Sequence, residues 1–74
     1  MAWRRTEATR MHNHVKALRQ DRGMTQQALA DALGVSRQTV HSIEAGKYDP
    51  SLPLAFKIAK VLGRTIEQVF VPED

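Results

Sequence analysis

Four polar side chains on one predicted helix carry the hydrogen-bonding groups that could read the edges of DNA bases. The helix is expected to begin after Ser36, and at about 100° per residue these side chains point away from its apolar face. The paired donors of an arginine fit O6 and N7 of guanine, and a glutamine amide fits N6 and N7 of adenine. The alternative is a helix face that is merely solvated. The predicted base-contacting residues are Arg37, Gln38, His41 and Ser42.

A second helix and a glycine turn come just before this helix and position it. Thr25 is expected to cap the earlier helix, which runs to Leu33, and Gly34 to end it in a left-handed conformation. The small Ala30 would let the two helices cross closely. The inner faces of the pair are expected to hold Leu29, Ala30, Leu33, Val40 and Ile43. Two short helices joined in this way predict a helix-turn-helix.

Three further helices are expected around this motif. The first covers residues 13–22, and the fourth covers residues 52–62. The fourth helix is apolar on nearly every side, so we expect it to form the buried centre of the domain. Thr65 and Gln68 have the spacing of a capping box that opens a short last helix.

The predicted fold class is therefore all-α, a compact five-helix bundle. An additional short β-pairing between residues 69–71 and residues 12–14 is left open. The chain has 74 residues, which predicts one domain near the lower size limit for a single core. We expect that domain at residues 11–71, with a C-terminal tail at residues 72–74.

Residues 1–10 have no apolar periodicity and are expected to form a flexible N-terminal extension. Two alternatives remain for this segment. It contains Arg4 and Arg5, which would suit a basic arm that reaches phosphates or a minor groove. Thr6 would also suit the start of an early helical turn.

The positive charge of the chain lies mainly in its first third. The net charge is +3 and the pI is about 9.8. Residues 1–24 carry six Lys or Arg against two acidic residues, whereas residues 25–50 carry two against three. The predicted base-reading motif is therefore not itself basic, and phosphate attraction must come largely from the N-terminal third and from helix N-termini.

The sequence gives little support for catalysis, metal binding or membrane insertion. The chain has no cysteine, no apolar run long enough to span a bilayer and no signal-peptide core. His12, His14 and His41 are the one candidate metal cluster, and nothing supplies further ligands at a recognisable spacing. We therefore expect no enzyme activity, no metal, no cofactor and no small-molecule ligand.

The segment TQQALADALGVSRQTVHSIEAGK resembles the DNA-binding motif of the Cro/C1-type (Xre-like) family of phage and bacterial repressors. The similarity continues through residues 50–63 to Phe70, and thus covers residues 11–71. The residues that carry it within the motif are Thr25, Gln26, Leu29, Ala30, Leu33, Gly34, Val35, Ser36, Val40, Ile43, Glu44, Gly46 and Lys47. The resemblance implies the phage-repressor fold, with the third helix in the major groove of double-stranded DNA. It also strengthens the base-contact prediction for Arg37 and Gln38.

The resemblance also implies roles for residues outside that outer face. An ion pair between Arg19 and Glu44 is expected to orient the third helix. Residues at the two ends of the motif, and Thr39 at the edge of the outer face, are expected to contact phosphates, which positions the protein without reading sequence. The predicted phosphate contacts are Thr25, Gln26, Thr39, Lys47 and Tyr48.

A homodimer is expected because the C-terminal end has more apolar residues than a small monomer is expected to bury. The predicted dimer interface consists of Val61, Ile66, Val69, Phe70 and Val71. The alternative is that Phe70 simply fills the core of its own chain. Two copies would place two recognition helices about 34 Å apart, one turn of DNA.

The expected function is that of a sequence-specific regulator in the cytoplasm, at the nucleoid. Repression by occupying a palindromic operator is favoured over metabolite-controlled switching, because the chain is too short to hold a sensing domain as well. One alternative is an antitoxin-type regulator that also binds a toxin or another protein. A second is a protein-interaction module that has lost DNA binding, although paired base-edge donors on an outer face argue against it.

Overall fold

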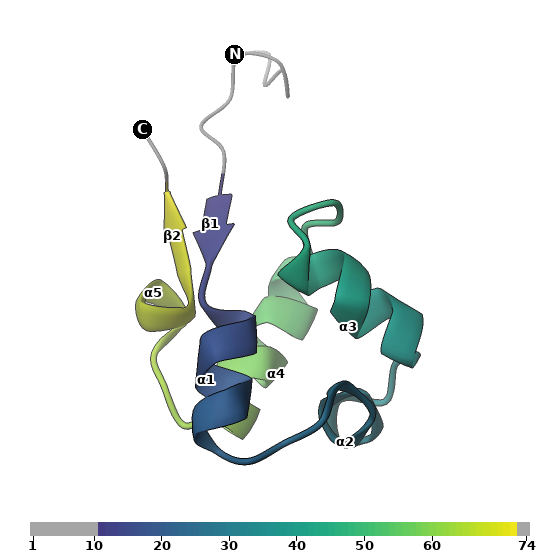
Figure 1. The fold of residues 1–74 in the computed structure, drawn as a ribbon. Coiled ribbons are helices and arrows are strands. Elements are labelled where there is room, and N and C mark those ends of the chain that lie inside the picture. Colours follow the sequence, from purple (N-terminus) through teal and green to yellow (C-terminus); the bar gives the residue numbers. More distant parts are fainter. Residues whose placement is uncertain (1–10, 73–74) are drawn as a thin grey trace.

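A computed structural model describes residues 11–72, which form five helices and a two-stranded sheet (Figure 1). The elements in chain order are β1 (Met11–Asn13), α1 (Val15–Asp21), α2 (Gln26–Leu33), α3 (Arg37–Glu44), α4 (Leu52–Leu62), α5 (Ile66–Val69) and β2 (Phe70–Pro72). The expected extension at 1–10 and the end of the expected tail at 73–74 lie outside the described residues. In the described part, no helix is long and apolar enough to cross a membrane.

The fold class predicted from the sequence is confirmed, including the short β-pairing. β1 and β2 run antiparallel, with His12 opposite Val71 and Asn13 opposite Phe70. Compared with the segments considered above, β1 lies one residue earlier in the chain and β2 lies one residue later. The backbone N–H of His14 also donates to the carbonyl of Val69, at 2.9 Å. The sheet therefore joins the two ends of the described chain beside α5 (Figure 1).

Four of the helices begin where a hydroxyl side chain accepts the backbone N–H three residues later. These capping residues are Thr25, Ser36, Ser51 and Thr65. The capping box at Thr65 is complete, because Gln68 Oε1 accepts the N–H of Thr65 at 2.9 Å. Gly34 ends α2 with φ of 76°, the left-handed conformation that its position in the turn requires. The sequence thus defines these boundaries locally.

The first helix is shorter than predicted. It begins at Val15 instead of Asn13, because residues 11–13 are extended and pair with β2. The residue before the helix, His14, makes no side-chain cap. Asn13 Oδ1 accepts the N–H of Val15 at 3.2 Å instead. A side chain from β1 therefore satisfies the first backbone N–H group of α1.

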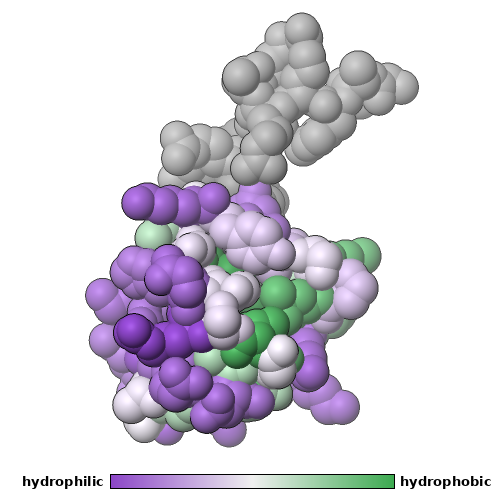
Figure 2. Space-filling model, turned by 90° about the vertical axis from the view of Figure 1, so that its right-hand side faces the viewer, coloured by the Kyte–Doolittle hydropathy of each residue, from purple (hydrophilic) through white to green (hydrophobic). Residues whose placement is uncertain are grey.

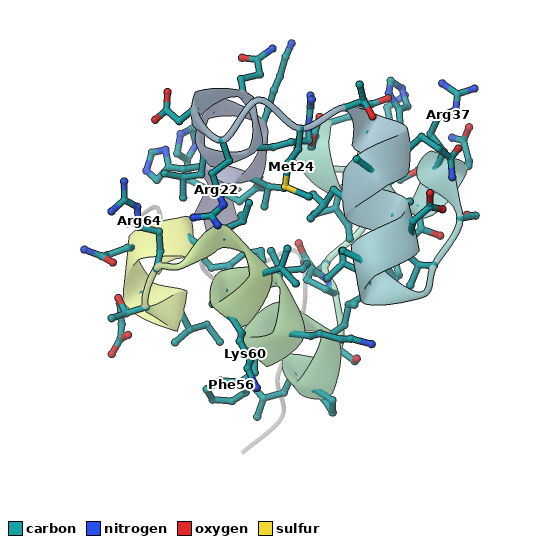
Figure 3. The ribbon with its side chains drawn as sticks, turned by 90° about the horizontal axis from the view of Figure 1, so that it is seen from below. Arg22, Met24, Arg37, Phe56, Lys60 and Arg64 are labelled. Carbon is teal, nitrogen blue, oxygen red and sulfur yellow. The ribbon has the colours of Figure 1, made fainter. Side chains whose placement is uncertain are left out.

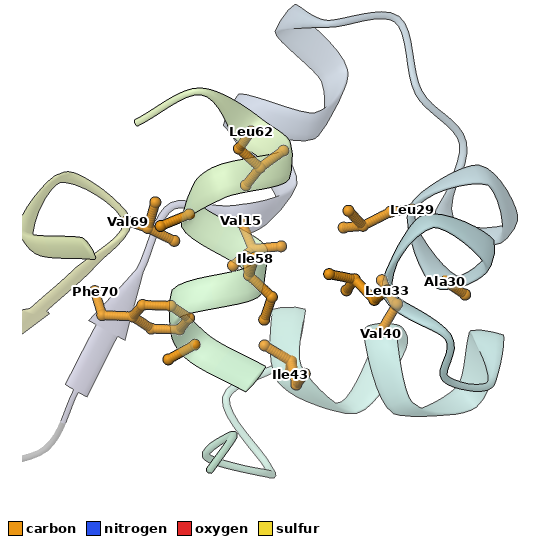
Figure 4. Close-up of a cluster of buried hydrophobic side chains, with 12 residues drawn as sticks. Val15, Leu29, Ala30, Leu33, Val40, Ile43, Ile58, Leu62, Val69 and Phe70 are labelled. Carbon is orange, nitrogen blue, oxygen red and sulfur yellow. The ribbon is translucent and has the colours of Figure 1, made fainter. Parts of the chain in front are cut away.

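The core gathers around the inner face of α4 (Figure 4). Ile58 is completely buried, as are Leu29 from α2 and Val69 from α5. Ala30 is also fully buried, as expected for a close crossing of the two motif helices. The full set of buried apolar residues is Val15, Leu29, Ala30, Leu33, Val40, Ile43, Ala55, Ile58, Ala59, Leu62, Val69 and Phe70.

Two expectations about burial were wrong. α4 is not buried on all sides, since Leu52 is 64% exposed and Phe56 is 56% exposed. Val69 and Phe70, which were expected to exceed what one monomer can bury, are only 0% and 9% exposed. The physical reason is that α5 and β2 fold back over α4, so these residues complete the monomer's own core.

Candidate nucleic-acid interface

The third helix has one buried and one open face. Val40 and Ile43 point into the core, each 1% exposed. Arg37, Gln38 and His41 are exposed on the other face, and Figure 3 shows Arg37 projecting outward from the body of the molecule. An arginine and a glutamine in the first turn of such a helix present several hydrogen-bond donors to a ligand.

Ser42, the fourth predicted base contact, is half-buried on the same helix. Its Oγ accepts Gln38 Nε2 at 3.4 Å, a long hydrogen bond between residues one turn apart. Because this bond is weak and exposed, it leaves the Gln38 amide available to another partner. The structure therefore brings the four predicted base-contacting residues onto one helix.

The predicted phosphate contacts are distributed around this helix. Lys47 and Tyr48 lie exposed in the loop after α3. Thr25 and Thr39 already hold local bonds: the hydroxyl of Thr25 caps α2, and Thr39 Oγ1 lies 2.9 Å from Ser36 Oγ. Thr39 is half-buried, so its hydroxyl is less open to a ligand than the Lys47 amine.

Gln26, at the start of α2, is held by a carboxylate. Its Nε2 donates to Glu44 Oε1 at 3.0 Å, which uses one of the two amide protons and leaves the other. The first turns of α2 and α3 contain no acidic residue. The partial positive charge at each helix N-terminus therefore remains available to an anion such as a phosphate.

The predicted ion pair connects α1 to the end of α3. Arg19 Nε donates to Glu44 Oε2 at 2.6 Å, and Arg19 Nη2 donates to Glu44 Oε1 at 3.1 Å. The two side chains are only 8% and 4% exposed. Arg19 Nη1 also donates to the carbonyl of Met24 at 2.7 Å. One guanidinium thus fixes α3, α1 and the turn before α2 relative to one another.

Glu44 stays ionised despite its burial. Desolvation acts to raise the pKa of Glu44. Hydrogen bonds from Arg19 and Gln26, together with the charges of Arg19 and Lys16, outweigh that effect and hold the pKa below its ordinary value of 4.5. The network is therefore charged and fully paired at neutral pH.

Two side-chain contacts of the motif were not expected from the sequence. Asn13 Nδ2 donates to the carbonyl of Ile43 at 2.9 Å, and Lys57 Nζ donates to the carbonyl of Leu33 at 3.0 Å. These bonds join residues 30 and 24 positions apart, respectively. No short sequence motif predicts such long-range hydrogen bonds, so they can be identified only in the folded structure.

A second surface, which we call the apolar hollow, lies on α4 and α5. It has a volume of about 450 Å³, and Leu52 forms part of its wall. Its other lining residues are Asp49, Pro50, Ala55, Ile66, Glu67 and Phe70. Phe56 is exposed on α4 near by in sequence, and Figure 3 places it on the opposite side of the molecule from Arg37.

Hydrophilic residues cover much of the face on the α3 side of the molecule, with a hydrophobic strip beside them (Figure 2). Residues 11–72 contain no group of three or more His, Asp or Glu side chains that could hold a metal ion. The rings of His12 and His14 meet edge to face, with centroids 5.3 Å apart. The exposed hydrogen-bond donors of α3 therefore suit a polar ligand, and the exposed apolar side chains of α4 suit an apolar partner.

Comparison with known proteins gives the family. A model described as helix-turn-helix matches residues 15–69. The HTH-type transcriptional regulator MJ0272 of Methanocaldococcus jannaschii is 58% identical over 64 residues, which span 86% of this chain and 97% of that protein. The HTH-type transcriptional regulator YgzD of Bacillus subtilis is 48% identical over 64 residues, which span 86% and 97%.

Solved structures agree with this assignment. The restriction-modification controller protein C.AhdI from Aeromonas hydrophila superposes with a TM-score of 0.69 at 30% identity, over 73% of this chain and 82% of that one. The resemblance noted in the sequence is thereby confirmed in both sequence and fold. The chain belongs to the Cro/C1-type helix-turn-helix family, and it is a DNA-binding transcriptional regulator.

Proposed function

We propose that this regulator is a repressor that binds a palindromic operator as a homodimer, with α3 of each copy in the major groove. The observation that carries the proposal is the division of α3 into a buried apolar face and an exposed donor face. Val40 and Ile43 hold the helix on the core, while Arg37 and Gln38 are exposed in its first turn. Bidentate donors at this place on a recognition helix suit guanine and adenine in the major groove.

The surrounding residues suit contacts to the DNA backbone. Gln26 lies at the uncompensated N-terminus of α2, and Lys47 and Tyr48 lie in the exposed loop beyond α3. We assign these three residues to phosphates on either side of the groove. Thr25 and Thr39 take weaker roles, since the hydroxyl of Thr25 caps α2 and that of Thr39 is hydrogen-bonded to Ser36.

The homodimer is proposed on a surface that differs from the one expected. Val69 is fully buried in the monomer and makes no contact across the interface, and the largely buried Phe70 contributes only to the wall of the apolar hollow. Leu52 and Phe56 are exposed one turn apart on α4, and Leu52 also forms part of the wall of the apolar hollow. In a two-fold dimer the same patch faces itself, so the protruding side chains of one copy can enter the hollow of the other. Val61, Ile66 and Val71 are half-buried, and Ile66 lines the hollow.

The dimer and the DNA face are compatible in space. Figure 3 shows Arg37 and Phe56 pointing to opposite sides of the molecule. Burying Leu52 and Phe56 would remove large apolar side chains from water, worth about 1.5–3 kcal/mol for each fully buried side chain. For a domain of this size, that is a substantial gain.

A mobility-shift titration tests the DNA half of the proposal. The full chain is titrated against the DNA upstream of its own gene, with an unrelated duplex as competitor, at two salt concentrations. We expect a complex that survives competitor, and an affinity that falls with salt because counterions are released. Equal affinity for both duplexes would reject a sequence-specific operator. Binding to neither duplex would favour the alternative of a protein-interaction module that has lost DNA binding.

If DNA is the target, the protein works in the cytoplasm at the nucleoid, and we expect no catalysis and no cofactor. The fold neighbour C.AhdI is by name a controller protein, which agrees with a regulatory role. Occupation of an operator is the simplest mechanism for a single helix-turn-helix domain. It needs no ligand other than DNA and a second copy of the chain.

A further inference from the structure

Asn13 lies between the sheet and the recognition helix and uses both ends of its amide. Its Nδ2 donates to the carbonyl of Ile43 at 2.9 Å, and its Oδ1 accepts the N–H of Val15 at 3.2 Å. Ile43 is the penultimate residue of α3. A single side chain of β1 thus reaches the end of α3, 30 residues away, while it also supports the start of α1.

The last two residues of α3 are therefore fixed by two different elements. The carbonyl of Ile43 is fixed by Asn13 from β1, and the carboxylate of Glu44 is fixed by Arg19 from α1. Two attachments at adjacent residues restrict the tilt of a helix more than either alone. The opposite end of α3, which carries Arg37, remains open to a ligand.

The same strand connects α3 to the apolar hollow. Asn13 lies opposite Phe70 in the sheet, and Phe70 lines the hollow. The backbone N–H of His14 donates to Val69 next to it. A continuous path of bonded and packed groups therefore runs from the hollow through β2 and β1 to the end of α3.

We propose that Asn13 is a positioning residue for DNA reading, which sets the tilt of α3 against the sheet and so against the surface where two copies meet. This proposal rests on the proposed function, because the tilt matters only if α3 enters DNA. In a dimer, the tilt of each α3 decides whether both recognition helices fit half-sites one turn apart. Asn13 then contributes to operator selectivity without touching DNA.

Asn13→Ser separates the two roles of this side chain. A serine hydroxyl can still accept the N–H of Val15, but it is too short to reach Ile43. Asn13→Asp is the second variant: it keeps the acceptor and replaces the donor with a carboxylate that repels the Ile43 carbonyl. Gly63→Ala is the matched control, since Gly63 has φ of 69° at the end of α4 and an alanine there is strained. That control lowers stability and leaves α3 unaltered.

The measurement compares affinity for the selected operator with affinity for the same DNA carrying one added base pair between its half-sites. All proteins are compared at a temperature where circular dichroism shows each of them folded. We expect both Asn13 variants to lose roughly 2- to 30-fold of this selectivity. Gly63→Ala should retain the wild-type ratio. Unchanged selectivity in the Asn13 variants, or an equal loss in Gly63→Ala, overturns the proposal.

A DNA-free measurement separates failure of this proposal from failure of the proposed function. Amide hydrogen exchange at residues 45–47, just after α3, reports how firmly the helix end is held. We expect Asn13→Ser to speed exchange there more than it does across α4, and Gly63→Ala to show the reverse. If wild-type protein has no selective DNA binding, the proposed function fails. If exchange at residues 45–47 is unchanged in Asn13→Ser, the positioning role fails whatever the DNA result.

Discussion

Arg19 and Glu44 meet through two hydrogen bonds, of 2.6 and 3.1 Å, in a nearly solvent-free position between α1 and the end of α3. The carboxylate also accepts Gln26, and the guanidinium also donates to Met24. The charges are therefore compensated on every side, and no buried side-chain N or O atom in the described residues lacks a partner. This pair fixes the recognition helix to the part of the chain that precedes it.

Replacing one partner of this pair should lower the free energy of unfolding more than replacing both partners by apolar residues. Glu44→Leu or Arg19→Met leaves a buried charge without its counter-ion, which typically costs about 3–5 kcal/mol. The double variant Arg19→Met with Glu44→Leu leaves an apolar contact and should lie much closer to wild type. Urea unfolding followed by circular dichroism gives the three free energies of unfolding. A double variant as unstable as the sum of the two single variants would contradict this account.

The stability contributed by Glu44 should depend on pH in one direction. Because the folded pKa of Glu44 lies below 4.5, its ionised form stabilises the fold above that pH, and this contribution is lost as pH falls through the folded pKa. The free-energy difference between wild type and Glu44→Gln should therefore be largest near about pH 7 and shrink toward about pH 3. Asp21→Asn, on the exposed surface of α1, is the control. A difference that stays constant or grows in acid would exclude the ionised network.

Alanine substitutions of base-contacting residues and of phosphate-contacting residues should affect DNA binding differently. Arg37→Ala or Gln38→Ala should each lose about 1–3 kcal/mol on the operator and relax preference at one position per half-site. Lys47→Ala should weaken binding to all sequences alike and reduce its salt dependence. Arg64→Ala removes an exposed charge outside the motif and serves as control. Unchanged preference in Arg37→Ala would show that α3 does not enter the groove as proposed.

The dimer prediction has to be tested at α4. Phe70 is buried in the monomer, so an acidic residue there would unfold the chain instead of separating two copies. Phe56→Asp, on the exposed face of α4, should give a folded monomer with much weaker, half-site-only DNA binding. Ala17→Asp adds the same charge on the exposed surface of α1 and should remain dimeric.

Analytical ultracentrifugation at tens of micromolar distinguishes these cases. Wild-type protein that sediments as a monomer would reject the homodimer. A Phe56→Asp variant that still sediments as a dimer would place the interface elsewhere.

Local signals in the sequence predicted much of the fold. Hydroxyl caps such as Ser36 and the left-handed Gly34 define helix ends through neighbours only three or four residues away, so the starts of the four capped helices could be predicted, whereas the uncapped start of α1 was placed two residues too early. The Arg19–Glu44 pair could be anticipated because the family resemblance supplied a long-range constraint. The division of α3 into two faces followed from its periodicity.

Long-range packing could not be read in the same way. The apolar pattern of α4 could not tell that Leu52 and Phe56 would stay exposed, because that depends on how α5 and β2 cover the helix. For the same reason the burial of Phe70 by its own chain could be considered only as the alternative to a role in the dimer interface. The bond from Asn13 to Ile43 requires strand pairing that places residues 30 positions apart together.

In-vitro selection from random duplex DNA, with the full chain as bait, tests the central claim most directly. It reports binding, symmetry and sequence in a single experiment. We predict enrichment of a palindrome whose half-sites lie about 34 Å apart centre to centre, with guanine or adenine at the positions that become degenerate in Arg37→Ala and Gln38→Ala. Failure to enrich any sequence, or enrichment of an asymmetric site that Arg37→Ala binds equally well, would contradict a dimeric reader that uses α3.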